Sequence, residues 1–427
     1  MTIAFHWNQG RLTIRPATAP NIRFGIAGDW APIRAFDPII EQDPAAIYGD
    51  LLPDLGAMDL SLVNLEAPLA DMGRPAVKSG AVFKGRTAHV AGLTAAHFSA
   101  VTLANNHVFD FGKEAFDQTL TTLDQAGIRH MGAGDSLDQA AQPLILEKNG
   151  IRLGLVNFSE GEELSQAGPH TPGVVGWELD LMEEKIRALG KEVDCIVAIA
   201  HCGIEYVPFP PSYVAKAFHR MVDAGAHLVV GHHPHVPQGV EIYKETPIFY
   251  SLGNFVFYQP IDRAFRKQGY WLSCTVDSKG LSGVDLHPYG IGDQGLFTLQ
   301  GKDKARFLED FKAVSLPLSQ NLAQDLSPSS GQERPHDQTW NAYLNYYGTR
   351  VFKEEIAQIL EDLTTDAPKG AAKFRNRITT LQHSELIKDT CTRIMEGRLD
   401  EADPSLVALI DQWLTQRLPQ ENGGQND

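Results

Sequence analysis

Short apolar runs alternate with amphipathic segments between about residue 22 and residue 257. Each run is a few residues long and is bounded by turn residues, which is typical of buried strands. The expected strands are residues 22–27, 60–65, 100–104, 153–158, 195–200, 227–230 and 248–251. The clearest segments with helical spacing are residues 113–125, 181–190 and 213–224. Strands that alternate with helices predict a layered α/β domain.

The pattern changes after Phe257. Residues 270–276 and 281–287 form two apolar runs on either side of an Asp-Ser-Lys-Gly turn, which predicts a hairpin. Helical spacing then dominates in residues 302–314, 340–363 and 387–418. We therefore expect an α/β domain over residues 22–300 and a helical C-terminal extension over residues 301–427. The extension has no recognisable chemistry, and we interpret it as a cap or an oligomer contact.

Composition excludes some classes of partner. The 427 residues contain 37 Lys and Arg against 53 Asp and Glu, a net charge of −16. Nucleic acids and anionic membranes are bound by basic surfaces, so we expect neither as a general partner. No apolar run approaches the roughly 20 residues that span a bilayer, and no signal peptide is recognisable. The four scattered cysteines favour reduced thiols, so we expect a cytoplasmic protein. Assembly into a homo-oligomer is compatible with the sequence.

The chemistry follows the ends of the predicted strands. In α/β sheets, ligands bind beyond the carboxyl ends of the strands. Five of the apolar runs end directly in groups that can bind metal ions. These groups are Asp29, the Asn-Leu-Glu motif at residues 64–66, the Asn-Asn-His motif at residues 105–107, His201 with Glu205, and the His-His-Pro-His motif at residues 232–235. Each alone has a structural explanation, such as a turn, a helix cap or a buried histidine, but the fivefold recurrence favours a metal site.

The His-His-Pro-His motif is the strongest single indication. In an extended segment, side chains alternate, so His233 and His235 would share a face while His232 points away. Pro234 favours this extended conformation at the residue before it. Carboxylate, amide and imidazole ligands together suit divalent transition metals such as Mn, Zn or Fe better than Ca. The sequence leaves open whether one or two ions bind per chain.

These motifs, with an Asn-His-Val-Phe-Asp-Phe-Gly run at residues 106–112 and a Ser-Leu-Gly-Asn-Phe run at residues 251–255, resemble those of the CapA family. This family, named for poly-γ-glutamate capsule synthesis, is related to the calcineurin-like metallophosphoesterases. The resemblance covers residues 22–258 in order. It implies a four-layer α/β/β/α sandwich with a two-metal site.

The resemblance also assigns a role to each motif residue. Asp29 and His235 would bind the first metal, Glu66 would bridge both metals, and Asn106, His201 and His233 would bind the second. His107 would act as the proton donor or contact the transition state, oriented by Asp110. Glu205 and Asn254 would support the ligands or bind substrate.

Two positions depart from the pattern of these families. Metallophosphoesterases usually carry a metal-binding histidine two residues after the first aspartate, where this chain has Ala31. The first metal would then have only three protein ligands. A tryptophan often follows the first histidine of the fourth motif, where this chain has Cys202, which predicts a smaller pocket wall.

Three functions are compatible with these residues. The first is phosphoester hydrolysis, in which bound metal ions lower the pKa of a water molecule and the resulting hydroxide attacks phosphorus. The second is hydrolysis or transfer of γ-glutamyl amides, linked to poly-γ-glutamate metabolism. The third is a non-catalytic subunit for capsule synthesis. The expected substrate is a small or oligomeric anion, which Lys78, Lys84 and Arg86 could contact, although solvated surface positions also explain these three residues.

Overall fold

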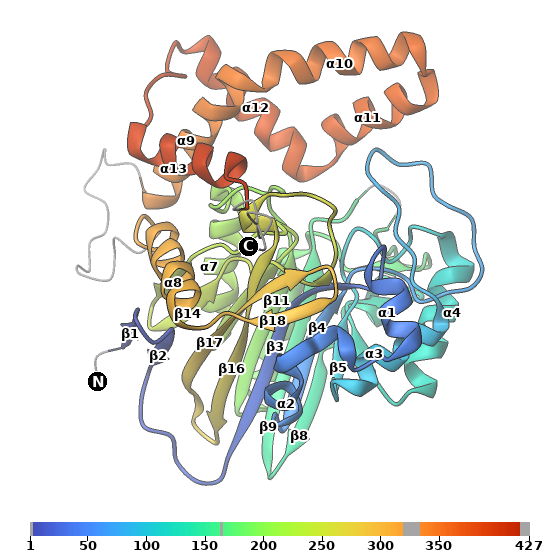
Figure 1. The fold of residues 1–427 in the computed structure, drawn as a ribbon, viewed down its shortest axis with the longest axis vertical. Helices are drawn as coiled ribbons and strands as arrows, with labels where there is room; N and C mark the ends of the chain where they lie inside the picture. The colour runs from blue at the N-terminus through green and yellow to red at the C-terminus, as the bar shows by residue number, and fades with distance from the viewer. Residues whose placement is uncertain (1–2, 163–164, 319–333, 419–427) are drawn as a thin grey trace, which may run out of the picture.

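The computed structural model describes residues 3–162, 165–318 and 334–418 (Figure 1). A ten-stranded sheet runs in the order β1-β2-β17-β16-β3-β4-β5-β6, with β15 paired to β3 and β18 paired to β17. Its strands are β1 (Ala4–His6), β2 (Arg11–Thr13), β3 (Asn21–Ala31), β4 (Leu60–Leu65), β5 (Ala100–Thr102), β6 (Arg129–Met131), β15 (Asn254–Phe257), β16 (Gln268–Asp277), β17 (Gly280–Gly292) and β18 (Gly295–Thr298). The predicted hairpin is confirmed as β16 and β17, and two strands that precede residue 22 extend the same sheet.

A six-stranded sheet faces the first in the order β13-β14-β12-β11-β9-β8. Its strands are β8 (Leu144–Lys148), β9 (Ile151–Ser159), β11 (Cys195–His201), β12 (Leu228–His232), β13 (Val240–Tyr243) and β14 (Thr246–Phe249). The inner strands β9, β11, β12 and β14 are parallel, and the two edge strands are antiparallel. A small pair, β7 (Ala133–Gly134) with β10 (Gly173–Val174), completes the strands. All seven strands expected from the apolar runs are confirmed.

Alternating side chains along the strands divide the interior into layers. Leu62 and Ile199 belong to the apolar cluster between the two sheets, whereas their neighbours Val63 and Ala198 belong to clusters beneath the outer helices. The helices outside the ten-stranded sheet are α1 (Phe36–Gln42), α2 (Leu52–Gly56), α3 (Val90–Ala95) and α4 (Gly112–Gln125). Those outside the six-stranded sheet are α6 (Leu179–Leu189) and α7 (Ser212–Ala224), with the short α5 (Leu137–Ala140) beside β7. The four-layer α/β/β/α arrangement is confirmed.

Parallel pairing brings the polar strand ends together. β3, β4 and β5 run parallel, with Asp29 in register with Asn64. In the second sheet, β11 and β12 run parallel with His201 in register with His232. The carboxyl ends of both sets point to the same end of the sandwich (Figure 1). Position 28, just before Asp29 in β3, requires a glycine, because a Cβ on Gly28 would lie 2.1 Å from the carbonyl oxygen of Gly253.

The remaining helices are α8 (Gly301–Ser315), α9 (Pro335–Arg350), α10 (Phe352–Thr365), α11 (Ala367–Thr379), α12 (Leu381–Met395) and α13 (Pro404–Thr415). The helical spacing expected over residues 340–363 is confirmed, but the range is divided between α9 and α10 at Val351. Residues 387–418 are likewise mostly helical but are divided between α12 and α13, and α11 was not predicted. Within the described residues, none of the helices has the length and apolar character needed to cross a membrane.

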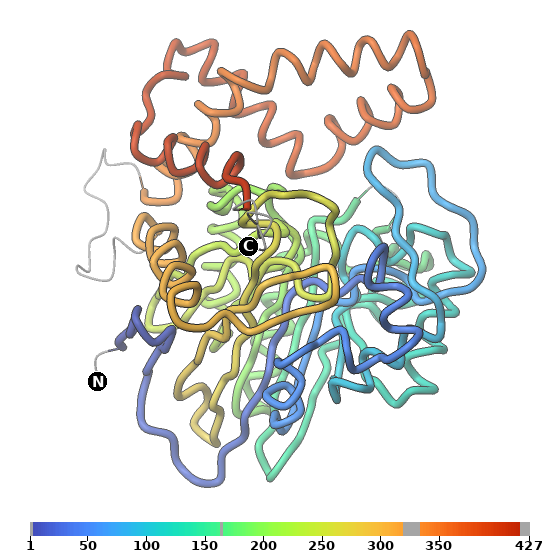
Figure 2. The backbone as a smooth tube through the Cα atoms, in the orientation of Figure 1, coloured from blue at the N-terminus to red at the C-terminus, as the bar shows by residue number. Residues whose placement is uncertain are grey.

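Helices α9 to α13 lie across the carboxyl ends of the strands, as the backbone path in Figure 2 shows. Trp340 and Trp413 join the apolar cluster of the six-stranded sheet, and the Trp413 ring stacks on Phe265 at a centroid distance of 3.6 Å. α8 instead contributes Phe307 and Phe311 to the cluster between the sheets. Residues 319–333 and 419–427 of the predicted extension lie outside the described residues.

A buried carboxylate fastens α9 to the sandwich. The same oxygen of Glu241 lies 2.9 Å from His219 Nε2 on α7 and 3.0 Å from His336 Nε2 on α9. It also accepts a hydrogen bond from the Tyr250 hydroxyl (2.6 Å). Burial opposes ionisation of Glu241, but the hydrogen bonds from His219 and His336 outweigh it and lower the pKa to about 2.

We expect Glu241→Gln to destabilise the protein by up to about 3 kcal/mol at pH 7, from the lowered pKa. Because the folded pKa lies below the ordinary value of 4.5, this contribution is present above pH 4.5 and is lost as the pH falls towards 2. Urea unfolding at a series of pH values should therefore show the two proteins converging on acidification. The exposed Glu147→Gln variant is the control, and a pH-independent difference would contradict the expectation.

Candidate metal centre

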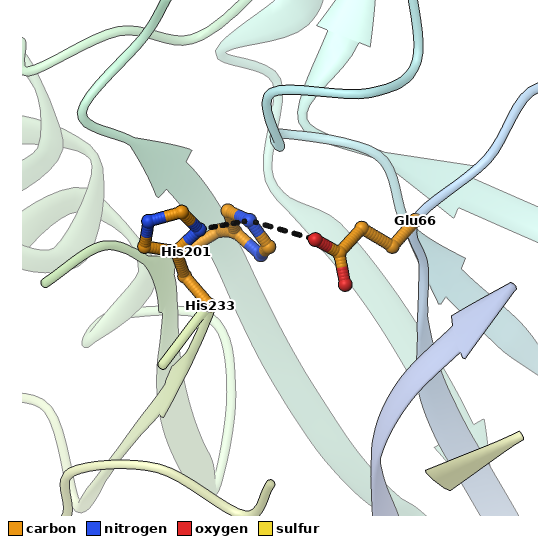
Figure 3. A group of neighbouring side chains, drawn as sticks. All are labelled: Glu66, His201 and His233. Atoms are coloured by element: carbon orange, nitrogen blue, oxygen red, sulfur yellow. Dashed lines mark hydrogen bonds and ion pairs between the residues drawn. The ribbon is translucent and has the colours of Figure 1, made fainter. Parts of the chain in front are cut away.

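Three side chains from three different elements converge at the strand ends (Figure 3). Glu66 directly follows β4, His201 is the last residue of β11, and His233 follows β12. His201 Nε2 lies 3.4 Å from Glu66 Oε1 and 3.1 Å from His233 Nδ1. One donor atom of each residue lies within 4.8 Å of the others, close enough for all three to hold one metal ion.

A second group shares the same glutamate. Asp29, Glu66 and His235 also offer donor atoms within 4.8 Å of one another. His235 Nδ1 lies 3.4 Å from Asp29 Oδ2, and His235 Nε2 lies 3.6 Å from Glu66 Oε1. Glu66 therefore stands between two potential ion positions, in the arrangement that the family resemblance implies.

The chemistry of these donors fits a bound cation. Both carboxylate oxygens of Glu66 and one of Asp29 are buried without a hydrogen-bond partner in the described structure. Leaving such acceptors unsatisfied in the interior costs free energy. Metal ions held by carboxylate oxygens and imidazole nitrogens would compensate for this cost, and these donors suit Zn, Mn or Fe.

The two carboxylates have opposite electrostatic environments. Burial raises the pKa of Glu66 well above its usual range, and the negative charges of Asp29 and Glu205 raise it further. Burial acts in the same direction on Asp29, but the adjacent imidazoles of His232 and His235 outweigh it and hold the pKa of Asp29 well below the usual range. Burial also lowers the pKa of His201, which favours the neutral imidazole that metals bind.

Two asparagines support the ligands. Asn106 Oδ1 lies 2.9 Å from His201 Nε2, so it belongs to the same centre as His201 and His233. The Asn64 amide donates to Asp29 Oδ1 (2.8 Å), and its nitrogen lies 3.2 Å from His201 Nδ1. Asn64 thereby connects the group of Asp29 and His235 with the group of His201 and His233. In the sequence, Asn64 stands out only as part of the Asn-Leu-Glu motif.

The predicted conformation of the His-His-Pro-His segment was wrong. His233 and His235 have φ angles of 100° and 57°, so the segment is not extended there. Their rings nevertheless face the centre, 6.0 Å apart between centroids. His232 does not point away, because its Nδ1 lies 3.3 Å from Asp29 Oδ1. The physical reason is that the motif turns sharply after β12, which simple strand alternation does not describe.

His107 lies at the edge of the centre with a fixed orientation. Its Nδ1 lies 2.6 Å from Asp110 Oδ2, and its Nε2 lies 3.9 Å from Glu66 Oε1. Lys78 donates to the other oxygen of Asp110 (2.9 Å) and pairs with Glu162 (2.9 Å). Burial lowers the pKa of His107, and the positive charge of Lys78 lowers it further, against the opposing effect of Asp110.

The two residues predicted to bind substrate occupy different places. Asn254 is buried, and its Oδ1 lies 2.9 Å from His235 Nδ1, so it contacts a candidate ligand directly. Glu205 is exposed, yet its carboxylate lies within 4.8 Å of donor atoms of His233 and His235. Only Glu205 lines the adjoining cavity.

A cavity of about 320 Å³ opens over His107 and His235. Its lining includes three cationic side chains, Arg34, Arg266 and Lys78, and two anionic ones, Glu162 and Glu205. Among the described residues, no carboxylate forms an ion pair with Arg34 or Arg266, whereas Lys78 is neutralised by Asp110 and Glu162. The two arginines therefore supply the positive charge of the cavity wall that no ion pair among the described residues compensates. The sequence pattern did not mark either of them.

Other sequence candidates lie elsewhere. Lys84 lies over the Phe111 ring at 4.6 Å, and Arg86 pairs with Asp37 and Glu41, so neither lines the cavity. Ala31 lies in a small apolar cluster and supplies no ligand. Cys202 is buried in the cluster beneath the six-stranded sheet. The expected effect of Cys202 on the pocket wall was wrong, because this residue is not part of the cavity lining.

The C-terminal helices also reach the centre. Gln382, on α12, places its Oε1 3.1 Å from His233 Nε2. The expectation that the extension carries no chemistry of its own was therefore incomplete. The two residues are 149 positions apart, and neither spacing nor composition marks this glutamine among the others of the chain.

The fold and the site define an α/β/β/α protein with a candidate two-metal centre at the strand ends. The family model described as "Bacterial capsule synthesis protein PGA_cap" matches residues 23–259, which is more than half of the chain. The chain belongs to this family, and the resemblance to CapA proteins is confirmed.

Two curated relatives are similar over part of their length. The PGA biosynthesis protein CapA of Bacillus subtilis (strain 168) is 36% identical over 166 residues, which cover 38% of this chain and 43% of that protein. The capsule biosynthesis protein CapA of Bacillus anthracis is 33% identical over 201 residues, covering 46% and 48%. The chain thus spans less than half the length of either relative. Among solved structures, the 5'-nucleotidase precursor from Thermus thermophilus matches 69% of this chain and 58% of that chain, with 16% identity and a TM-score of 0.42.

We expect the purified protein to carry one to two equivalents of transition metal, measured by elemental mass spectrometry. The His233→Ala/His235→Ala double variant removes a donor from each group and should lose this metal. The exposed His170→Ala variant should retain it. Absence of metal from the unmodified protein, even after reconstitution with Mn or Zn, would contradict the assignment.

Proposed function

We propose that this protein is a metal-dependent hydrolase that cleaves phosphoesters. The observation that carries the proposal is the buried Glu66 carboxylate, which has no hydrogen-bond partner among the described residues and is shared by two groups of side chains able to hold a metal ion. Such a pair of sites on one bridging carboxylate is suited to displacement at phosphorus. When bound, the metal ions would supply charge neutralisation of the phosphoryl oxygens and an activated water molecule.

The surrounding side chains have separate roles in this proposal. Asp29, Glu66, Asn106, His201, His233 and His235 would hold the ions. Asp110 fixes the His107 ring so that Nε2 faces Glu66. From this position, His107 can hold a proton for the leaving oxygen, because Nε2 is close to the centre and the ring also lines the cavity.

The cavity supports an anionic substrate. The Arg266 guanidinium lies 3.4 Å above the Tyr206 ring and donates to Gln259 (2.7 Å), which fixes its orientation. The Arg34 guanidinium donates to the Tyr258 carbonyl (2.9 Å). Two oriented guanidiniums that pair with no carboxylate among the described residues favour a ligand with a carboxylate or phosphate group. We therefore propose a phosphoester with a second anionic group.

The same arginines favour one alternative. A substrate rich in carboxylates, such as a γ-glutamyl oligomer, would satisfy them equally well, and the activated water of a metal centre can attack a carbonyl carbon. Capsule synthesis by the family is consistent with this alternative. Product analysis with a γ-glutamyl oligomer beside a phosphoester panel distinguishes the two reactions. Absence of either cleavage by metal-loaded protein would instead indicate a non-catalytic role in capsule synthesis.

We expect the metal-loaded protein to hydrolyse 4-nitrophenyl phosphate, with a near-complete loss of activity in His233→Ala. The His107→Ala variant should lose about 10²–10⁴-fold in kcat, the usual contribution of a positioned proton donor. Its metal content should stay unchanged, because His107 is not one of the proposed ligands. Full activity in either variant would contradict the proposed mechanism.

We further expect the protein to prefer 3-phosphoglycerate to glycerol 3-phosphate, which lacks the carboxylate. The Arg34→Gln/Arg266→Gln double variant should reduce this preference by about 10–100-fold in kcat/KM, the value of one charged hydrogen bond. Activity on glycerol 3-phosphate should change little. Phosphate release measures both rates, and Arg23→Gln, at the opposite end of β3, is the matched control. An unchanged preference in the double variant would exclude the arginine pair as a substrate contact.

A further inference from the structure

The N-terminal turn of α12 enters the metal centre. Gln382 is the second residue of this helix, and its Oε1 lies 3.1 Å from Nε2 of His233. Both side chains are buried. Gln382 also lines a small cavity together with Asn106, His201 and His233, so it borders the second metal position directly.

The backbone of Gln382 is anchored independently of its side chain. The Gln382 N–H donates to the carboxylate of Glu160, which directly follows β9. Glu160 also accepts hydrogen bonds from the Gly203 N–H (2.7 Å) and the Tyr213 hydroxyl (2.6 Å). The start of α12 is therefore tied to the six-stranded sheet, and the amide of Gln382 has a defined position over His233.

This contact determines which nitrogen of His233 is available. An amide oxygen only accepts hydrogen bonds, so the His233 Nε2 facing Gln382 must carry the hydrogen. Nδ1 then keeps its lone pair, and Nδ1 is the atom that lies 3.1 Å from His201 Nε2 inside the centre. Histidines that bind metals commonly donate the hydrogen of the second ring nitrogen to an oxygen in this way.

We propose that Gln382 is a positioning residue of the metal centre, which holds His233 in the tautomer and orientation that binds the second metal ion. The C-terminal helical extension is then part of the site, although it lies outside the family match over residues 23–259. The inference rests on the metal centre of the proposed function. It adds that α12 must be docked on the sandwich for full metal affinity.

The test compares two substitutions at one position. Gln382→Leu keeps the approximate size but removes the acceptor, and Gln382→Glu keeps the acceptor. Affinity for Zn²⁺, measured by competition with a chromophoric chelator, should fall about 10–100-fold for one of the two ions in Gln382→Leu. Gln382→Glu should stay within a few-fold of the unmodified protein. Gln412→Leu, an exposed glutamine on α13, is the matched control and should bind normally.

A spectroscopic measurement separates positioning from packing. In the Co²⁺-loaded protein, the visible absorption reports ligand geometry, and Gln382→Leu should change it while Gln382→Glu preserves it. Equal losses in both variants would indicate a packing role and overturn the proposal. Unchanged affinity and spectrum in Gln382→Leu would also overturn it.

The unmodified protein gives a check that does not depend on the Gln382 variants. The ¹⁵N shifts of His233, assigned by comparison with His233→Ala, should show hydrogen on Nε2 in the Zn²⁺-loaded state, and the opposite tautomer would overturn the proposal. Metal binding without phosphoester cleavage would refute the proposed function alone, since the affinities still decide the role of Gln382. Failure of the unmodified protein to bind metal would refute both.

Discussion

The two carboxylate oxygens of Glu66 lie in the interior with no hydrogen-bond donor among the described residues, between imidazoles that approach from two directions. A buried carboxylate is stable only when a cation or a proton compensates for its lost hydration. The arrangement of the strand ends follows from this requirement. His201 approaches from the six-stranded sheet, and Asp29 approaches from the neighbouring strand of the same sheet as Glu66. The free energy of ion binding would accordingly be linked to the stability of the junction between the sheets.

The backbone of the segment after β12 is locally strained, because His233 and His235 have positive φ angles. Non-glycine residues with positive φ cost of order 1–3 kcal/mol and persist where the surroundings fix them. Here the Tyr206 N–H donates to the Pro234 carbonyl (2.7 Å), and the Asn254 amide donates to the His235 carbonyl (3.3 Å). These bonds hold a sharp turn in which His233 and His235 reach two different positions around one carboxylate. In an extended segment, both rings would instead lie on the same face of the strand.

Three parts of the chain contribute to the centre. The ten-stranded sheet supplies the carboxylates, the six-stranded sheet supplies the imidazoles, and the C-terminal helices reach it through Gln382. The helices are held by Glu241 with His336 and by the stacking of Trp413 on Phe265. Loss of those distant contacts would therefore disturb a site that none of these residues touches. In this way, the stability of the extension and the geometry of the site depend on each other.

The sequence determined the strands, the hairpin and the positions of the polar strand ends, because apolar periodicity and burial are local properties of the chain. It also placed Asp29, Glu66, Asn106, His201, His233 and His235 together, since the carboxyl ends of parallel strands meet at one edge. Helix boundaries in the extension were not predicted. The break at Val351 has no Gly or Pro of its own, whereas Gly397, with a φ of 65°, and Pro404, in the first turn of α13, mark the break after α12.

Only the tertiary structure decided the contacts between distant segments. Sequence spacing does not predict the contact of Gln382 with His233, the contact of His232 with Asp29, or the position of the two arginines in the cavity wall. Each of these depends on how packed layers and loops meet in space, and a glutamine or arginine there has the same local sequence pattern as a solvated one. The chain thus encodes its candidate metal-binding residues locally, whereas their orientation and the cavity beside them follow from long-range packing.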